Sequence, residues 1–102
     1  MKIPYGYAKT ENKEIMINEE QADVVKLIYN AYLQGKSLGG IVEILKANGI
    51  LSPKGNLEWT RQAVDNILAN SKYIAGIIIF EEFTAVQIEK RNRTNNKSKN
   101  NF

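Results

Sequence analysis

The sequence predicts a mainly helical α+β fold, in which a short N-terminal β-hairpin precedes a three-helix, helix-turn-helix-like core. Three observations support this prediction. Residues 3–17 contain two apolar runs around a polar turn, as paired strands do. Three later segments, at about 19–34, 38–48 and 61–69, repeat apolar residues at helical spacing. Each of these segments follows a residue that caps helices well, and Gly- or Pro-containing stretches separate them.

The hairpin is the first element. Ile3, Tyr5 and Tyr7 alternate with other residues, and Glu14–Ile17 forms the second apolar run. Between the two runs, the polar segment Thr10–Lys13 predicts the turn.

The first helix is expected over residues 19–34. Asn18 is a good N-cap, and Gln21 is placed to reach back to it in a capping box. Glu19 and Glu20 complement the positive end of the helix dipole. Gly35 follows, where a helix commonly ends in the left-handed conformation. The apolar face consists of Ala22, Val25, Ile28, Tyr29 and Tyr32.

The second helix is expected to begin after Ser37 as its N-cap and to end at Gly49. Gly39 and Gly40 in its first turn are poor helix formers. Their missing side chains indicate close approach by another part of the protein, from helix one or three, or by a ligand. The apolar face consists of Leu38, Ile41, Ile44 and Leu45.

The third helix follows the turn-rich loop Ile50–Glu58. Thr60 is its expected N-cap and Asn70 closes it, while Trp59 and Val64 have the spacing of a hydrophobic staple. Its apolar face consists of Ala63, Val64, Ile67 and Leu68. A compact helix-turn-helix motif joins its helices by about 3–4 residues. The longer loop here predicts that Trp59 and the loop hold the third helix in place.

The C-terminal part is less regular. Ile77–Phe80 is consistent with a strand or with the start of a buried helix, and a helix from about Glu82 to Arg91 is expected to follow. The net charge of +3 comes mainly from residues 89–102, which hold five of the 14 Lys and Arg residues and one of the 11 acidic residues. A basic, Asn-rich tail is typical of a disordered linker, although it could also lie along a phosphate backbone. We therefore expect a domain over residues 1–92 and a disordered linker over residues 93–102.

Composition argues against catalysis by this chain. It has no Cys and no His, so thiolate zinc sites, disulfides and the commonest general base are excluded. No serine has a histidine to activate it or a neighbouring lysine in a recognisable nucleophile motif. The carboxylate pairs Glu19/Glu20 and Glu81/Glu82 are explained by helix starts. We expect a non-catalytic chain without a metal or cofactor. No apolar run approaches the roughly 18 residues of a membrane span, which favours a cytoplasmic location.

Nucleic-acid binding is the functional class that the remaining polar residues favour. The third helix should expose Arg61, Gln62, Asp65 and Asn66. Arginine pairs with guanine, and glutamine or asparagine with adenine, in the major groove of DNA. Thr60 and the first-turn N–H groups suit a phosphate. Other expected phosphate contacts are Lys36, Ser37 and Lys54. The alternative is that Arg61 and Gln62 belong only to a solvated helix face.

An ordered series of short motifs then resembles one known family. The motifs are Pro4-Tyr5-Gly6-Tyr7, Asn18-Glu19-Glu20-Gln21-Ala22, Gly35-Lys36-Ser37-Leu38, Asn48-Gly49-Ile50, Ser52-Pro53, Trp59-Thr60, Ile67-Leu68 and Tyr73 with Gly76. In their order they resemble the recombinase domain of large serine recombinases, the integrases and transposases of phages and conjugative elements. The resemblance covers nearly the whole chain.

The resemblance implies a DNA-binding module that recognises duplex attachment-site DNA and positions a catalytic domain. In that family the serine nucleophile and a cysteine-ligated zinc domain lie in other parts of the protein. The expected partners are double-stranded DNA and the other domains of the parent recombinase, with no membrane and no small-molecule substrate. The alternative functions are a protein–protein interaction module or a stand-alone transcriptional regulator.

Overall fold

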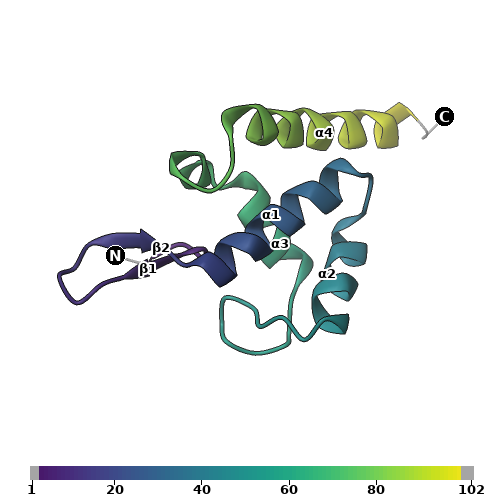
Figure 1. Cartoon of the computed structure of the whole chain (residues 1–102). Helices are drawn as coiled ribbons and strands as arrows, with labels where there is room; N and C mark the ends of the chain where they lie inside the picture. Colours follow the sequence, from purple (N-terminus) through teal and green to yellow (C-terminus); the bar gives the residue numbers. More distant parts are fainter. Residues whose placement is uncertain (1–2, 100–102) are drawn as a thin grey trace.

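The computed structural model describes residues 3–99, which form a small helical body with a projecting hairpin (Figure 1). Its elements in chain order are β1 (Tyr7–Lys9), β2 (Ile15–Ile17), α1 (Glu19–Leu33), α2 (Leu38–Ala47), α3 (Arg61–Ala69), the 3₁₀ helix η1 (Ser71–Ala75) and α4 (Phe80–Lys99). The mainly helical α+β fold with an N-terminal hairpin is therefore confirmed. Among the helices described, none has the length and apolar character needed to cross a membrane.

The hairpin has short strands and a tight polar turn. β1 and β2 are antiparallel, with Tyr7 opposite Ile17 and Lys9 opposite Ile15. The Thr10 N–H donates to the Glu14 carbonyl at 2.8 Å, which closes the expected turn. Two isolated strands are marginally stable in water. The first strand is attached to the helical body by the Tyr7 hydroxyl, which donates to the Lys72 carbonyl at 2.8 Å.

All three helix N-caps are confirmed. The side-chain oxygens of Asn18, Ser37 and Thr60 accept from the backbone N–H three residues later, at 3.0–3.1 Å. Each cap satisfies one of the N–H groups that a helix start leaves unpaired. These positions also fix the three helix starts that the sequence predicts.

The prediction of a capping box at the start of α1 is wrong for Gln21. Gln21 does not reach back to Asn18; its Oε1 accepts instead from the Gly6 N–H, at 2.8 Å. The Asn18 N–H donates to the Gly6 carbonyl at 2.9 Å, so it has no need of Gln21. Gly6 has φ +105°, and an added Cβ would lie 3.0 Å from Ile77 and 3.2 Å from Tyr73. Glycine at this position therefore lets the N-terminal segment lie against the start of α1.

Helix α1 contacts the other three α-helices and carries the centre of the core. Tyr29 is completely buried, and its ring packs edge-on against Tyr73 with 6.5 Å between ring centroids. Its hydroxyl lies within hydrogen-bonding distance of the carbonyls of Ile67 and Leu68, at 2.9 and 3.2 Å. The buried apolar residues of the helical body are Ala22, Val25, Ile28, Ala31, Tyr32, Ile41, Val42, Leu45, Trp59, Val64, Ile67, Leu68, Ile77, Ile78 and Val86.

The loop before α3 is held by its own side chains, as expected. Trp59 is buried, and its indole N–H donates to the Ile50 carbonyl at 2.8 Å. Tyr5 packs edge-on against it with 5.8 Å between ring centroids. Ser52 is buried as well and donates to the Asn56 side chain at 3.0 Å. These contacts fix the start of α3 although no tight turn connects it to α2.

Residues 77–80 do not form a strand. The N–H groups of Ile77 and Ile78 both donate to the Tyr73 carbonyl, at 3.0 and 2.9 Å, which closes the end of η1. Ile77 and Ile78 are buried, whereas Ile79 and Phe80 are exposed, and α4 begins at Phe80. The apolar run thus supplies two core residues at a bend, and in the described part of the chain the only sheet is β1–β2.

Helix α4 is longer than the sequence predicts. The sequence predicts a helix over residues 82–91 followed by a linker from residue 93, whereas α4 begins at Phe80 and continues to Lys99. The linker prediction for residues 100–102 lies outside the described residues. Arg93 accounts for part of the extension, because its guanidinium donates to the carbonyls of Tyr32 and Lys36, at 2.8 and 2.9 Å. It also lies 3.8 Å from the centre of the Tyr32 ring.

The Tyr29 hydroxyl should contribute measurably to stability. We expect Tyr29→Phe to lower the free energy of unfolding by about 1–2 kcal/mol, since the buried carbonyls at the end of α3 lose a donor. Urea denaturation followed by circular dichroism measures this change. Tyr5→Phe is the matched control, because its hydroxyl makes a 3.4 Å contact with the Leu51 carbonyl at the surface. An equal loss of stability in both variants would contradict this role of Tyr29.

The buried tyrosines should make the fold sensitive to alkali. Burial raises the pKa of Tyr29 and Tyr73 above the ordinary value of 10.0. Below pH 10 these tyrosines are protonated in the folded and in the unfolded chain, so their contribution to stability is fully present. Above pH 10 the unfolded chain loses tyrosine protons that the folded chain retains. The free energy of unfolding should therefore fall by about 1.4 kcal/mol per pH unit for each such group. In denaturation measured from pH 8 to about 11.5, Tyr29→Phe should show a shallower decline than the wild type; identical slopes would exclude Tyr29 as a source.

Candidate nucleic-acid interface

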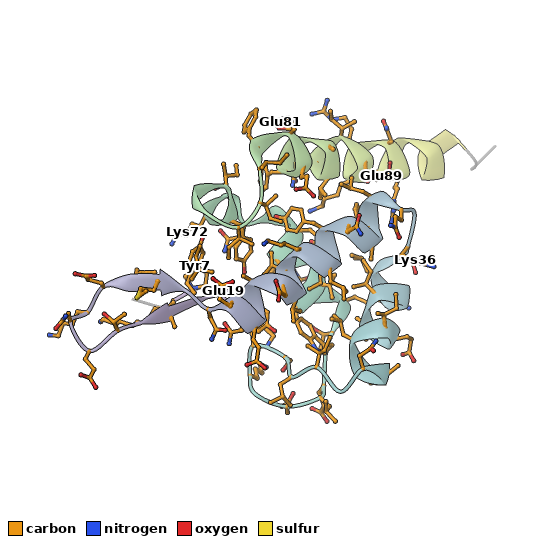
Figure 2. All side chains as sticks on the ribbon, viewed as in Figure 1. Tyr7, Glu19, Lys36, Lys72, Glu81 and Glu89 are labelled. Carbon is orange, nitrogen blue, oxygen red and sulfur yellow. The ribbon has the colours of Figure 1, made fainter. Side chains whose placement is uncertain are left out.

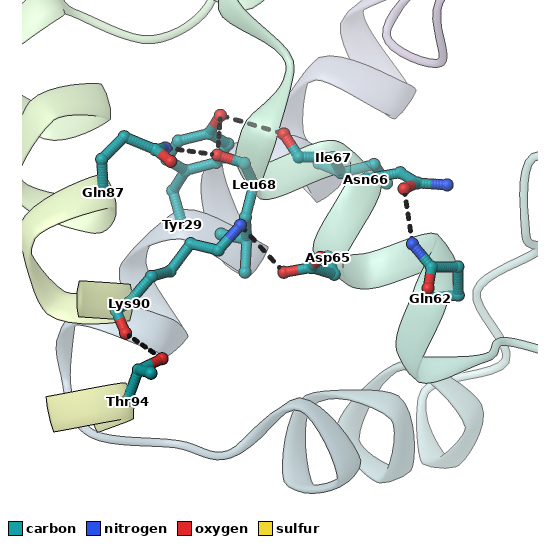
Figure 3. Close-up of polar contacts among 9 residues, drawn as sticks. All are labelled: Tyr29, Gln62, Asp65, Asn66, Ile67, Leu68, Gln87, Lys90 and Thr94. Atoms are coloured by element: carbon teal, nitrogen blue, oxygen red, sulfur yellow. Dashed lines mark hydrogen bonds and ion pairs between the residues drawn. The ribbon is translucent and has the colours of Figure 1, made fainter. Parts of the chain in front are cut away.

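The N-terminal half of α3 presents its polar residues to solvent. Arg61, Gln62 and Asn66 are exposed, whereas Val64 and Ile67 on the opposite side are buried. The Gln62 Nε2 donates to the Asn66 Oδ1 at 2.8 Å, so these two amides lie together on one face (Figure 3). The first N–H groups of a helix have no partner within the helix and carry its positive dipole end. This turn therefore combines free donors with side chains that can read base edges.

A groove of about 610 Å³ runs beside this face of α3. It brings together three of the residues singled out in the sequence, which are Lys54 from the loop, the N-cap Thr60, and Asn66 from α3. Its other wall comes from the N-terminal segment, with Tyr5 and Tyr7. One carboxylate, Glu58, also lines it. The groove thus joins the loop, α3 and the first strand into one surface.

The sequence did not point to the far end of this groove. Lys72 and Asn70 line it there, next to Tyr7. The Tyr7 ring stacks on Tyr73 with 6.0 Å between ring centroids, and its hydroxyl donates to the Lys72 carbonyl. Lys72 follows α3 directly in the chain, but no local pattern marks it as a groove residue, because Tyr7 of the first strand forms the opposite wall there.

A second, shallower hollow lies on the other side of the α3 start. Ser37, Gly39 and Arg61 line it, together with the carboxylate-bearing Glu43. A Cβ at Gly39 would lie 3.0 Å from Nη2 and 3.1 Å from Nε of Arg61. The close approach predicted for the glycines of α2 is therefore made at Gly39 by the Arg61 guanidinium. Among residues 3–99, neither of the ion pairs formed involves Arg61.

Lys36 lies apart from these residues. It is exposed at the junction of α1 and α2, and its carbonyl accepts from Arg93. Figure 2 shows Lys36 on the side of the helical body near Glu89, away from Tyr7 and Lys72. It lines neither the groove nor the second hollow.

Asp65 is less available than the sequence suggests. Its side chain is partly buried, and its Oδ1 lies 3.0 Å from the Nζ of Lys90 on α4. The expectation that Asp65 is simply exposed beside Gln62 and Asn66 is therefore wrong. A contact with a residue 25 positions later cannot be read from the local helix pattern.

The polar groups around the start of α3 have the chemistry to bind an anion. Among the described residues, no three carboxylates come together as a metal site would require. Burial raises the pKa of five tyrosines, Tyr5, Tyr7, Tyr29, Tyr32 and Tyr73. Lysine, arginine, amide and hydroxyl groups around a helix N-terminus form a set that recognises an anion.

Comparison with known proteins places the chain in a family. A model of the Recombinase family matches residues 19–102. The Bacillus subtilis (strain 168) protein named "Putative DNA recombinase" is 36% identical over 75 residues, which are 68% of this chain and 15% of that protein. The chain therefore spans a small part of its curated relative.

A solved structure has a similar fold. The structure is described as "Crystal Structure of a LSR-DNA Complex", and its chain matches with a TM-score of 0.69 and 24% identity. The match covers 86% of this chain and 32% of the solved one. At this identity the likeness concerns the fold. Since the family match covers most of the chain, and its motifs resemble those of the large serine recombinases, the chain belongs to the Recombinase family.

Proposed function

We propose that this chain binds duplex DNA through the N-terminal half of α3. The observation that carries the proposal is the solvent-exposed side of α3, which presents Arg61, not ion-paired within the described residues, in its first turn and the Gln62–Asn66 amide pair farther along. Arginine and amide side chains on one helix face can contact guanine and adenine in the major groove. Helix-turn-helix proteins insert the start of their second helix in this way.

Phosphate contacts would come from the two hollows beside α3. Lys54 and Thr60 border the groove, and Ser37 borders the second hollow. Lysines and helix N-termini contact phosphates without reading sequence, and they orient a recognition helix. Lys36, which lies on another side of the body, is the weakest of the phosphate contacts named from the sequence. Phosphate contacts would thus hold the bound duplex from both sides of Arg61.

The family and the solved relative support DNA as the partner. The structure of similar fold is a complex with DNA, and the family is that of recombinases. We infer that the parent protein is a site-specific serine recombinase and that this chain recognises its attachment-site DNA. In that role the chain would position a catalytic domain and the parent's other domains without itself taking part in strand exchange.

A protein-interaction module remains the main alternative, and a stand-alone transcriptional regulator is another. An interaction module should show no salt-dependent retention on heparin or DNA, whereas DNA binding weakens linearly with the logarithm of salt concentration. A regulator without further domains would bind as a dimer to two half-sites, which sedimentation of the DNA complex distinguishes.

Arg61 should be the most sensitive position for DNA binding. We expect Arg61→Ala to weaken binding about 10-fold or more and to relax the preference at one base pair, because a bidentate arginine contact is lost. The probe is a duplex selected from a randomised library by the 102-residue chain, titrated in a gel-shift assay. Lys26→Ala, an exposed charge on α1, is the matched control and should have a small effect. Unchanged affinity and unchanged base preference in Arg61→Ala would remove α3 as the reader.

Gly39 tests the placement of the Arg61 guanidinium without removing it. Gly39→Ala should leave the fold as stable or slightly more so, since alanine favours the helix by about 0.5–1 kcal/mol. The new Cβ would nevertheless meet the guanidinium at 3.0 Å and displace it. We therefore expect weaker binding of the selected duplex by Gly39→Ala, and no further loss when Gly39→Ala is added to Arg61→Ala. A Gly39→Ala variant that binds like wild type would show that this placement is unimportant.

A further inference from the structure

Asp65 stands at an unfavourable position for the proposed function. It is the one acidic residue of α3, and it directly precedes Asn66. It also lies four residues after Arg61, so the two side chains share a helix face. A carboxylate at this place has two harmful effects: it repels phosphates, and it can pair with the Arg61 guanidinium that DNA recognition needs.

Lys90 of α4 occupies the Asp65 carboxylate instead. The Lys90 Nζ lies 3.0 Å from Asp65 Oδ1, and the two side chains are 28% and 35% exposed. Figure 3 shows Lys90 extending from α4 to Asp65 on α3, with the Gln62–Asn66 pair beyond Asp65. With the carboxylate held there, the Arg61 guanidinium lies over Gly39 on the other side of the helix start.

Neighbouring contacts on α4 fix Lys90 in this position. One turn before it, the Gln87 Nε2 donates to the Leu68 carbonyl at 2.8 Å. One turn after it, Arg93 donates to the carbonyls of Tyr32 and Lys36. These three residues face the same side of α4, and Lys90 lies between two anchors that do not involve Asp65. The packing of α4 as a whole therefore places the Lys90 ammonium group beside Asp65 on α3.

We propose that Lys90 is a positioning residue for DNA recognition, which neutralises Asp65 and so keeps Arg61 available to DNA. The inference rests on the proposed function of α3. It makes the DNA affinity of α3 depend on the docking of α4, because an undocked α4 would leave Asp65 free to repel phosphates and to pair with Arg61. Lys90 acts through Asp65 and does not itself contact a phosphate.

A double-mutant cycle tests this role. The wild type, Lys90→Gln, Asp65→Asn and the double variant are titrated by fluorescence anisotropy against the duplex selected by the wild-type chain. Lys90→Gln should weaken binding by about 5- to 10-fold at 0.1 M salt, the size of one charge in the DNA interface. Asp65→Asn should bind at least as tightly as wild type, and the double variant should bind like Asp65→Asn. Lys90→Arg, which retains the ion pair, should restore binding.

Other outcomes would overturn the inference. One such outcome is that Lys90→Gln reduces DNA affinity equally in the wild-type and in the Asp65→Asn background. If the salt dependence of binding also falls by about one charge, Lys90 is a phosphate contact. Weaker binding by Asp65→Asn with a changed preference at one base pair would make Asp65 a reader of cytosine. A loss in Lys90→Gln that matches a lower melting temperature, and persists in the double variant, would reduce the pair to a structural role.

Arg61→Ala in the same titration separates this inference from the proposed function. If Arg61→Ala weakens binding and Lys90→Gln does not, the inference fails while α3 remains the reader. If the wild-type chain shows no salt-dependent binding to any selected duplex, the proposed function fails and the inference fails with it.

Discussion

The buried carboxyl-terminal end of α3 is the constraint on which the rest of the structure depends. A helix end leaves carbonyl groups without partners inside the helix, and leaving them buried and unpaired costs free energy. Here the carbonyls of Ile67 and Leu68 accept from the Tyr29 hydroxyl of α1, and the Leu68 carbonyl also accepts from Gln87 of α4 (Figure 3). A nine-residue helix is too short to be stable alone in water. Helix α3 therefore exists because α1 and α4 complete it.

Helix α4 gives the same kind of support to α1. Arg93 donates to the Tyr32 and Lys36 carbonyls and lies on the Tyr32 ring, so it complements the negative end of the α1 dipole. With α1 and α3 fixed at their carboxyl ends, the amino end of α3 faces solvent with its N–H groups and Arg61. The two ends of α3 thus differ, since the protein satisfies the carbonyl groups at one end, and the other end is the part to which the proposed function assigns DNA binding.

Under the proposed function DNA would meet this exposed end of α3, and the contacts around it limit which side chains are free to bind. The Asp65 carboxylate is paired with Lys90, whereas Thr60 caps the helix and also borders the groove. Arg61, Gln62 and Asn66 remain on the outer face, with Lys54 and Lys72 along the groove. The proposed dependence of Arg61 on Lys90 would link recognition to the position of α4.

The sequence alone determined the elements whose signals are local. The caps at Asn18, Ser37 and Thr60 and the helical spacing of apolar residues located three helices, because these signals act within one turn of the chain. Tertiary structure decided what depends on residues distant in sequence. The course of Ile77–Phe80, the length of α4 beyond Arg91, the diversion of Gln21 to Gly6 and the pairing of Asp65 with Lys90 all depend on contacts between separate elements. Such contacts form only when the helices pack, so no local pattern encodes them. The candidate reading residues of α3 could be named from the sequence, but only packing shows that Lys72 lines the same groove as Asn66, that Lys36 lies apart from that groove and that Asp65 is paired with Lys90.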